Sequence, residues 1–461
     1  MQTECNSKQL EFSCVGRRRV VVAFDGGTVS SDAGALLLKQ ADGAIGLLDR
    51  LAGCFADHRD PRLIEHSVRT ILGQRVFGMA LGYEDLNDHE TLRRDPVFGV
   101  LLGKLAAHRR DCAPLAGKST LNRFELYPRD AISRYHKIVP DVGALERLFV
   151  EIFLDAHRQA PEEIILDLDA TDDPLHGHQE GRFFHGFYDG YCYLPLYIFA
   201  GEHLLVAKLR RANIDGSAGA LEEVERVIGQ IRVRWPATRI ILRGDSGFAR
   251  DSLMSWCEQN TVDYVFGLAR NARLTRAIGA ELYEAARESH ATGRPVRRFK
   301  ELVYTTRKTW SRSRRVVAKA EHIAGDKSNP RFVVTTLPQT RIDARQLYEE
   351  LYCARGDMEN RIKEAQLDLF ADRLSTATFR ANQLRLWLSS CAYVLRHALK
   401  RVGLNGTQFA RATAHTIRLK LLKIGAVVTI SVRRIRFAMS SAHPYQAEYR
   451  AAFEALGAAA R

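Results

Sequence analysis

The stretch EEIILDLDATDDPLHG, residues 162 to 177, constrains the fold and the chemistry of the chain more than any other. Its apolar residues predict a β-strand, whose alternate side chains point to opposite faces. Leu166 and Leu168 then lie on one face, and Asp167 and Asp169 lie on the other. Two carboxylates on one strand face repel each other unless a cation lies near them. The segment therefore predicts a strand whose acidic face binds a divalent cation such as Mg²⁺ or Mn²⁺.

The segments that follow this strand predict a mixed sheet. Strands are expected at residues 162–171, 181–190, 191–201, 203–211, 239–247 and 262–269, and helices at 218–235 and 251–260. Three antiparallel strands, a crossover helix and then parallel strands are the order of a ribonuclease H-like sheet. The predicted fold class is α/β, a ribonuclease H-like mixed sheet with flanking helices, a β-rich insertion and a mostly helical N-terminal region.

The balance of charge indicates a polyanionic partner. The chain has 68 Lys and Arg against 54 Asp and Glu, a net charge of +14. Residues 294–319 hold ten Lys or Arg against one acidic residue, and residues 401–461 hold ten against two. Basic segments of this kind make phosphate contacts that do not depend on sequence. Nucleic acid is therefore the favoured partner, and a solvated basic surface is the alternative.

The length of 461 residues allows two to four domains. We expect four parts. Residues 1–155 would form a mainly helical DNA-binding region, and residues 156–270 together with 341–375 would form the ribonuclease H-like catalytic core. Residues 271–340 would be a β-rich basic insertion, and residues 376–461 a basic region for DNA or subunit contacts.

Two further acidic residues are candidates for the same site. Asp245 comes directly after a strand, where open α/β sheets bind ligands, although capping of the next helix is the alternative. Glu359 lies on a long helical pattern, about residues 343–369, in a polar stripe with Arg355 and Lys363. A solvated helix with i to i+4 ion pairs would show the same stripe.

Four segments of the chain resemble a known family: LDLDATDDPLHG, GRFFHGFYDGYCYLPLYIF, LRGDSGFAR and YCARGDMENRIKE. They are similar to the DDE transposases of bacterial insertion sequences, in particular the thirteen-eighty family, and the resemblance covers nearly the whole chain. It implies metal-dependent DNA strand cleavage at the ends of an insertion sequence and strand transfer into target DNA. Related enzymes carry a Tyr-x2-Arg-x3-Glu-x6-Lys signature. Tyr352, Arg355 and Glu359 match it, whereas Gln366 stands at the position of the Lys.

The resemblance also implies the site residues. Asp169, Asp245 and Glu359 would be catalytic and would hold two Mg²⁺ or Mn²⁺ ions. Asp167 is the second choice for the first carboxylate. The residues expected to contact DNA are Tyr352, Arg355, Lys363, Trp310, Arg312, Arg314, Arg315 and Arg123.

Two of these DNA contacts have structural alternatives. Trp310 lies in the most basic segment, where an indole could stack on a flipped base, but the pattern favours the alternative of a core tryptophan in a β-rich module. Arg123 would lie on a short helix capped by Ser119, either the second helix of a helix-turn-helix or a generic capped helix.

The expected partners are double-stranded DNA, both terminal inverted repeats and target DNA, and a second copy of the chain in a homodimer or larger assembly. No apolar run is long enough for a membrane span, and the first residues lack the features of a signal peptide, so a cytoplasmic protein is expected. The competing hypothesis is a non-catalytic DNA-binding protein derived from a transposase. The three carboxylates favour the enzyme, because a protein that only binds DNA has no use for an acidic pocket.

Overall fold

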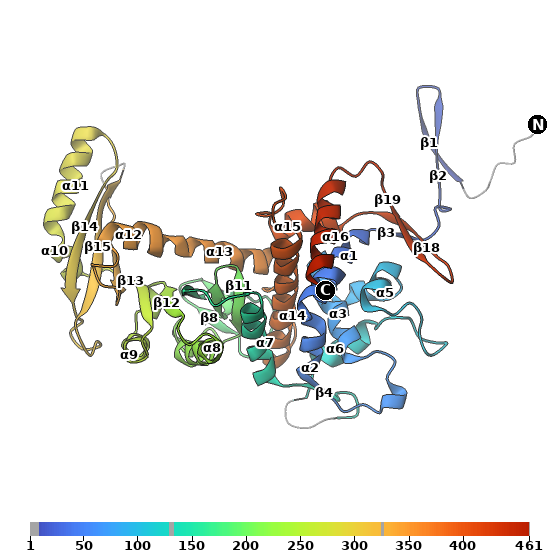
Figure 1. The fold of residues 1–461 in the computed structure, drawn as a ribbon, viewed down its shortest axis with the longest axis horizontal. Coiled ribbons are helices and arrows are strands. Elements are labelled where there is room, and N and C mark those ends of the chain that lie inside the picture. The colour runs from blue at the N-terminus through green and yellow to red at the C-terminus, as the bar shows by residue number, and fades with distance from the viewer. Residues whose placement is uncertain (1–8, 129–132, 324–326, 461) are drawn as a thin grey trace, which may run out of the picture. The chain divides into compact units, whose positions relative to one another are not determined.

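The computed structural model describes residues 9–128, 133–323 and 327–460 (Figure 1). The chain divides into two compact units, which are treated separately below. The first unit comprises Met1–Leu48, Arg59–Phe124 and Ala398–Arg461, and the second comprises Asp49–His58 and Glu125–His397.

The second unit is built on a nine-stranded mixed sheet. Its strand order is β11 (His203–Lys208), β10 (Leu196–Ala200), β6 (Glu163–Ala170), β12 (Arg239–Gly244), β13 (Asp263–Leu268), β17 (Arg331–Thr335), β15 (Arg314–Ile323) and β14 (Val296–Tyr304), and β16 (Lys327–Ser328) pairs with β15. β6, β12 and β13 are parallel to one another, and the pairs on either side of them are antiparallel. The predicted mixed sheet is confirmed.

Each face of this sheet has its own core, as the alternation along β6 predicts. Leu166 and Leu168 belong to a large apolar cluster that includes residues of α7 (Val142–Asp155), α8 (Ala220–Arg234) and α9 (Asp251–Gln259). Ile165 packs against a second cluster on the other face. That cluster contains Leu347 and Tyr348, so the helical run that begins near residue 344 covers the face on which the aspartates of β6 lie.

The predicted helix at about residues 343–369 is confirmed, but it is irregular. It runs through α12 (Ala344–Gln346), η5 (Leu347–Tyr352), η6 (Cys353–Arg355), α13 (Gly356–Lys363) and η7 (Glu364–Asp368), and η5 and η7 are π-helical. Insertions of π-helix in longer helices occur frequently at functional sites. The next helix, α14 (Phe379–Ala398), follows the predicted pattern.

The segment predicted as the second antiparallel strand, residues 181–190, does not join the main sheet. It forms part of a small sheet of β7 (Asp173–Pro174), β9 (Gly190–Tyr193) and β8 (Phe183–His185). The neighbour of β6 is β10 instead. Pro195 has no N–H for a sheet ladder, and it lies between β9 and β10, which the sequence predicts as one strand.

The predicted β-rich insertion at residues 271–340 is partly helical. It begins with α10 (Ala272–Ala277) and α11 (Gly279–Thr292), and its strands β14, β15 and β17 continue the main sheet beyond β13. β4 (Phe55–Asp57) and β5 (Ile138–Pro140) form a separate pair in the same unit. The division of the chain into four functional parts stays a prediction.

The first unit is mainly helical and contains both ends of the chain. Its elements are β1 (Gln9–Val15), β2 (Arg18–Ala23), β3 (Val29–Ser30), α1 (Leu36–Ile45), α3 (Val68–Leu81), α4 (His89–Leu92), α5 (Pro96–Leu102), α6 (Lys118–Glu125), α15 (Ala414–Ile417), β18 (Ala426–Ile430), β19 (Ile435–Met439) and α16 (Gln446–Ala459), and α2 (Leu47–Gly53) crosses its boundary. β18 pairs with β3, and α16 packs against α1, so the C-terminal segment is folded rather than a basic tail.

No helix in the part of the chain that the structure describes is both long and apolar enough to cross a membrane.

Candidate active site

The register of β6 and β12 brings two of the candidate carboxylates together. In this parallel pair Leu168 lies opposite Gly244, so Asp169 and Asp245 follow at the same edge of the sheet. Asp245 directly follows β12 and caps the short 3-10 helix η4 (Ser246–Phe248), since its Oδ1 accepts a hydrogen bond of 2.8 Å from the N–H of Gly247. The capping considered from the sequence, that of the helix α9, is not present, because Arg250 precedes α9.

Arg355 connects the strand and helix carboxylates. Its Nη1 lies 3.4 Å from Oδ1 of Asp169, and its Nη2 lies 2.5 Å from Oε1 of Glu359. The side chains of Asp169 and Arg355 are 14% and 19% exposed, whereas that of Glu359 is 43% exposed. The i to i+4 ion pair of a solvated helix face is present, but its arginine also reaches an aspartate on the sheet.

The electrostatics of Asp169 reflect a crowded acidic site. Burial raises the pKa of Asp169 to about 7, Arg355 opposes this shift, and Asp245 and Glu359 add to it. Burial lowers the pKa of Arg355, but Glu359 and Asp169 more than compensate, so the net shift is upward. A carboxyl group with such a perturbed pKa, next to other acids at a sheet edge, is typical of a functional site.

Asp167, the second choice for the first carboxylate, has a different partner. Its Oδ1 and Oδ2 accept hydrogen bonds of 2.5 and 2.8 Å from Arg243, and the two side chains are only 4% and 8% exposed. Arg243 also donates to the carbonyl oxygen of Leu351 at 2.6 Å. This paired, buried carboxylate joins β6 to β12 and to the helical run. Sequence analysis missed Arg243, although an arginine inside the apolar strand RIILRG was the available signal.

Tyr352 lies against the backbone beside Asp245. A Cβ atom at Gly267 would be 2.5 Å from the hydroxyl of Tyr352 and 3.0 Å from the backbone nitrogen of Ser246. Gly267 therefore gives Tyr352 access to the end of β12. Burial raises the pKa of Tyr352, so its hydroxyl stays protonated near neutral pH and can donate a hydrogen bond.

The donor set has the oxygen chemistry that a hard divalent cation requires, because it consists of three carboxylates. In the structure, however, the guanidinium of Arg355 lies between two of them. No three His, Cys, Asp or Glu side chains within residues 9–128, 133–323 and 327–460 converge closely enough to hold a metal ion. Asp245 and Glu359 both raise the pKa of Asp169, so the three acids are close enough to influence one another, and they are the residues that would hold such an ion.

Gln366, at the position where the resemblance implies Lys, has a structural contact. Its Nε2 donates to Oδ1 of Asp173 at 2.8 Å and to the carbonyl oxygen of Asp172 at 3.0 Å. Asp173 is fully buried, and burial raises its pKa well above the usual range. Lys363 is exposed one turn earlier on the same helical run, so its ammonium group is available to a ligand.

The four residues predicted as DNA contacts near residue 310 have different surroundings. Trp310 is half-buried and packs against the main core, with its ring 5.8 Å from that of Tyr304. Arg314 is buried and pairs with Glu258 at 2.6 Å. Arg315 is largely buried and pairs with Glu301 at 2.6 Å. Arg312 is 62% exposed, so of the four it has the side chain that is most open to solvent.

Arg123 is exposed on α6, as predicted, but the cap of this helix is different. Ser119 lies inside α6 rather than before it, and the N–H of Lys118 donates to Oε1 of Glu90 at 2.8 Å. Ser119 is thus not the cap, because a carboxylate from another helix satisfies the free N–H.

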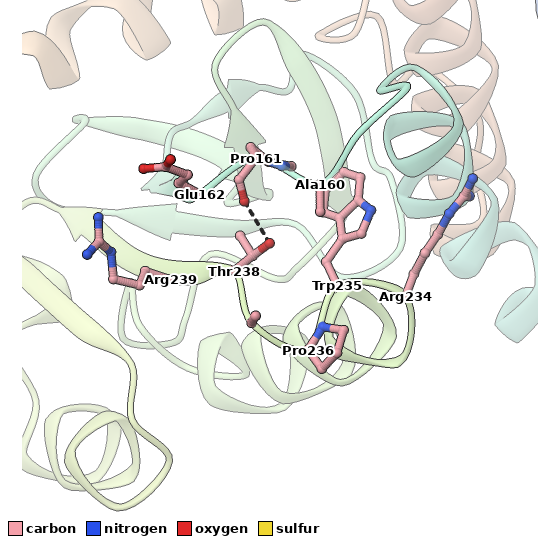
Figure 2. Close-up of a pocket in the computed structure, with 9 residues that line it drawn as sticks. Ala160, Pro161, Glu162, Arg234, Trp235, Pro236, Thr238 and Arg239 are labelled. Carbon is pink, nitrogen blue, oxygen red and sulfur yellow. Dashed lines mark hydrogen bonds between the residues drawn. The ribbon is translucent and has the colours of Figure 1, made fainter.

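A pocket of about 490 Å³ lies at the opposite ends of the same strands, where β6 and β12 begin (Figure 2). Its lining includes Trp235, Pro236 and a single carboxylate, that of Glu162. The hydroxyl of Thr238 donates to the carbonyl oxygen of Pro161 at 2.8 Å across its floor. This pocket lacks the clustered acids of the other sheet edge, so it is not the candidate site.

A family model described as "Transposase DDE domain group 1" matches residues 12–460 of the chain. The chain belongs to this family of DDE transposases. No curated protein shows significant sequence similarity to it. Among solved structures, it is similar to a piggyBac transposase in a synaptic complex with hairpin DNA, at 11% identity and a TM-score of 0.39 over 85% of this chain and 80% of that one.

The match extends over almost the whole length of the chain. The model covers both units, so the helical first unit belongs to the same transposase as the unit with the carboxylates.

Proposed function

We propose that the chain is a transposase that cuts DNA at the ends of a bacterial insertion sequence of the thirteen-eighty family and transfers the cut strands into target DNA. Asp169, Asp245 and Glu359 would be its catalytic carboxylates. The observation that carries this proposal is the single guanidinium, that of Arg355, shared by Asp169 from β6 and Glu359 from α13. The strand order β11-β10-β6-β12-β13 supports a ribonuclease H-like core.

DDE transposases use divalent metal ions, and in this chain the three carboxylates would hold Mg²⁺ or Mn²⁺, with two ions expected. When bound, such ions activate the attacking oxygen and stabilise the leaving oxygen of a phosphodiester displacement. Asp169 is preferred to Asp167, because Arg243 already neutralises Asp167 with two hydrogen bonds.

The chain's own residues would position the DNA. Arg355, released from the carboxylates, and Lys363 would pair with phosphates next to the cut. Tyr352 lies beside Asp245, so its hydroxyl would donate a hydrogen bond to a phosphate oxygen next to the cut. The partners would be double-stranded DNA with the terminal inverted repeats, target DNA, and a second copy of the chain.

The test is cleavage of a labelled duplex that carries the ends of the element, in Mg²⁺, by wild type, Glu359→Gln and the matched control Glu350→Gln. Glu350 is exposed on the same helical run. We expect wild type and Glu350→Gln to leave a 3′-OH at the element boundary, and Glu359→Gln to bind the duplex without cutting it. If all three bind equally and none cuts in Mg²⁺ or Mn²⁺, the non-catalytic DNA-binding protein is the better account.

A further inference from the structure

The β8–β9 hairpin, residues 183–193, carries aromatic rings on its outer face. Phe184, Phe187 and Tyr191 are 54%, 84% and 47% exposed. Phe184 lies opposite Tyr191 across the two strands, with ring centroids 5.7 Å apart. Phe184 and Tyr191 form one exposed pair, and Phe187 lies in the turn between the two strands. Large exposed rings gain nothing for the core, so these three residues of one hairpin indicate a binding surface.

The inner face of the same hairpin fixes it beside the carboxylates. Phe183 and Tyr188 pack against the small core cluster that Ala170 also contacts. The hydroxyl of Tyr188 donates to the carbonyl oxygen of Ala170 at 3.5 Å, and Ala170 directly follows Asp169. The ring of Phe187 is 5.0 Å from that of Tyr188. A single residue, Tyr188, therefore separates the exposed ring of Phe187 from the end of β6.

Arg182 places a positive charge beside one of the exposed rings. The guanidinium of Arg182 lies 4.6 Å from the centroid of the Tyr191 ring. Burial and the negative charges of Asp172, Asp169 and Asp245 raise the pKa of Tyr188 to about 12, so the packed face of the hairpin lies close to the acidic edge of the sheet. Bases stack on aromatic rings whatever their sequence, and an arginine beside the rings attracts the phosphates between the bases.

The turn of the hairpin is well defined. Asp189 has φ of 50°, a left-handed conformation that aspartate tolerates in turns. The side chain of Arg182 also donates to the carbonyl oxygen of Gly177, which ties the hairpin to the segment after β7. A platform held in one conformation loses less entropy when it binds a ligand.

We propose that Phe184, Phe187 and Tyr191 form a stacking platform for unpaired DNA bases, and that it holds a separated strand end next to Asp169, Asp245 and Glu359. This inference rests on the proposed function, because the cleavage reaction produces the DNA end. It adds that the platform binds the unpaired bases of that end. Trp310, the aromatic residue predicted for such a role, is half-buried against the core, whereas these rings are exposed.

The test compares binding of a fluorescent single-stranded oligonucleotide with binding of the duplex of the same sequence, without metal. We expect Phe187→Ala to weaken single-strand binding by about fivefold to a hundredfold, the loss of one base stack. Duplex binding should change less than about twofold, because duplex bases already stack on one another. Phe187→Tyr should keep wild-type binding. Val303→Ala is the control, because Val303 is equally exposed, at 84%, on β14 of the same unit.

The outcomes separate the platform from the catalytic site. Single-strand binding by Phe187→Ala equal to wild type overturns the platform, and so does an equal loss for single strand and duplex. A change of sedimentation coefficient with no change in DNA binding would assign the hairpin to a subunit contact and also overturn it. If wild type never cuts DNA but Phe187→Ala shows the selective loss, the platform stands and the proposed function fails.

Discussion

The two aspartates of β6 should respond in opposite ways to the same change. Asp167→Asn removes the charge that faces Arg243 and leaves a guanidinium that is only 8% exposed without its counterion. Loss of one partner from a buried ion pair costs about 3–5 kcal/mol. One hydrogen bond to the amide oxygen and the bond from Arg243 to Leu351 persist, so we expect a loss of about 3 kcal/mol in the free energy of unfolding.

Asp169→Asn should be neutral or stabilising, because it removes one of several acids that crowd a partly buried site. The measurement is urea unfolding of the full chain at pH 7.5, followed by circular dichroism. DNA cleavage is measured on the same samples. We expect Asp167→Asn to have a lower free energy of unfolding than wild type. We expect Asp169→Asn to be at least as stable as wild type and unable to cut DNA. An Asp169→Asn variant less stable than Asp167→Asn, or one that still cuts, would refute the assignment of Asp169 over Asp167.

The remaining predictions concern the helix, the strand end, the first unit and a buried acid. Arg355→Gln should bind Mn²⁺ more tightly than wild type in the absence of DNA, because the guanidinium group no longer pairs with Asp169 and Glu359. Equal or weaker binding in calorimetry would contradict this. Gly267→Ala should destabilise the chain by about 1–3 kcal/mol and impair cleavage, since its Cβ would lie 2.5 Å from the Tyr352 hydroxyl; unchanged thermal unfolding and activity would argue against that contact. Burial alone would raise the pKa of Glu65, but hydrogen bonds from Lys104 and the His108 N–H lower it to about 2. This pKa is below the unfolded value of about 4.3, so the stabilisation is present above pH 4 and is lost as pH falls towards 2. Glu65→Gln should therefore lower the unfolding temperature at pH 7 and converge with wild type near pH 2. Asp173→Asn should change stability by less than about 1 kcal/mol, because burial raises the pKa of Asp173 and so favours its neutral form, which Asn resembles; a larger loss in urea unfolding would contradict this.

The strands and helices around the site could be predicted because their periodicity is strong. The alternation of apolar and acidic residues in β6 placed Leu166 and Asp167 on opposite faces, and the structure has one core on each face. The long helix was also predicted within two residues of its ends. Its π-helical turns could not be, because they depend on packing against the sheet rather than on helix propensity.

The interaction partners of the site residues could not be predicted from the sequence. Arg243 pairs with Asp167 only because β6 and β12 are parallel in a register that no local pattern specifies. Residues 181–190 have a strand pattern, but the strand that pairs with β6 in the main sheet is β10, which follows Pro195. Tertiary contacts, and not local strand preference, decide which segment joins the sheet. Ser119 fits a cap by residue type, yet Glu90 supplies the acceptor from elsewhere in the chain.

Asp169, Asp245 and Glu359 are proposed to hold the divalent cations of a transposase. The most direct measurement replaces Mg²⁺ with Fe²⁺ and maps where locally generated hydroxyl radicals cut the protein backbone, in the presence of DNA. The account predicts cuts close to residues 169, 245 and 359 in wild type, which Mg²⁺ suppresses and Asp169→Asn abolishes. Cuts that cluster elsewhere, or cuts near these residues that persist in Asp169→Asn, would contradict it.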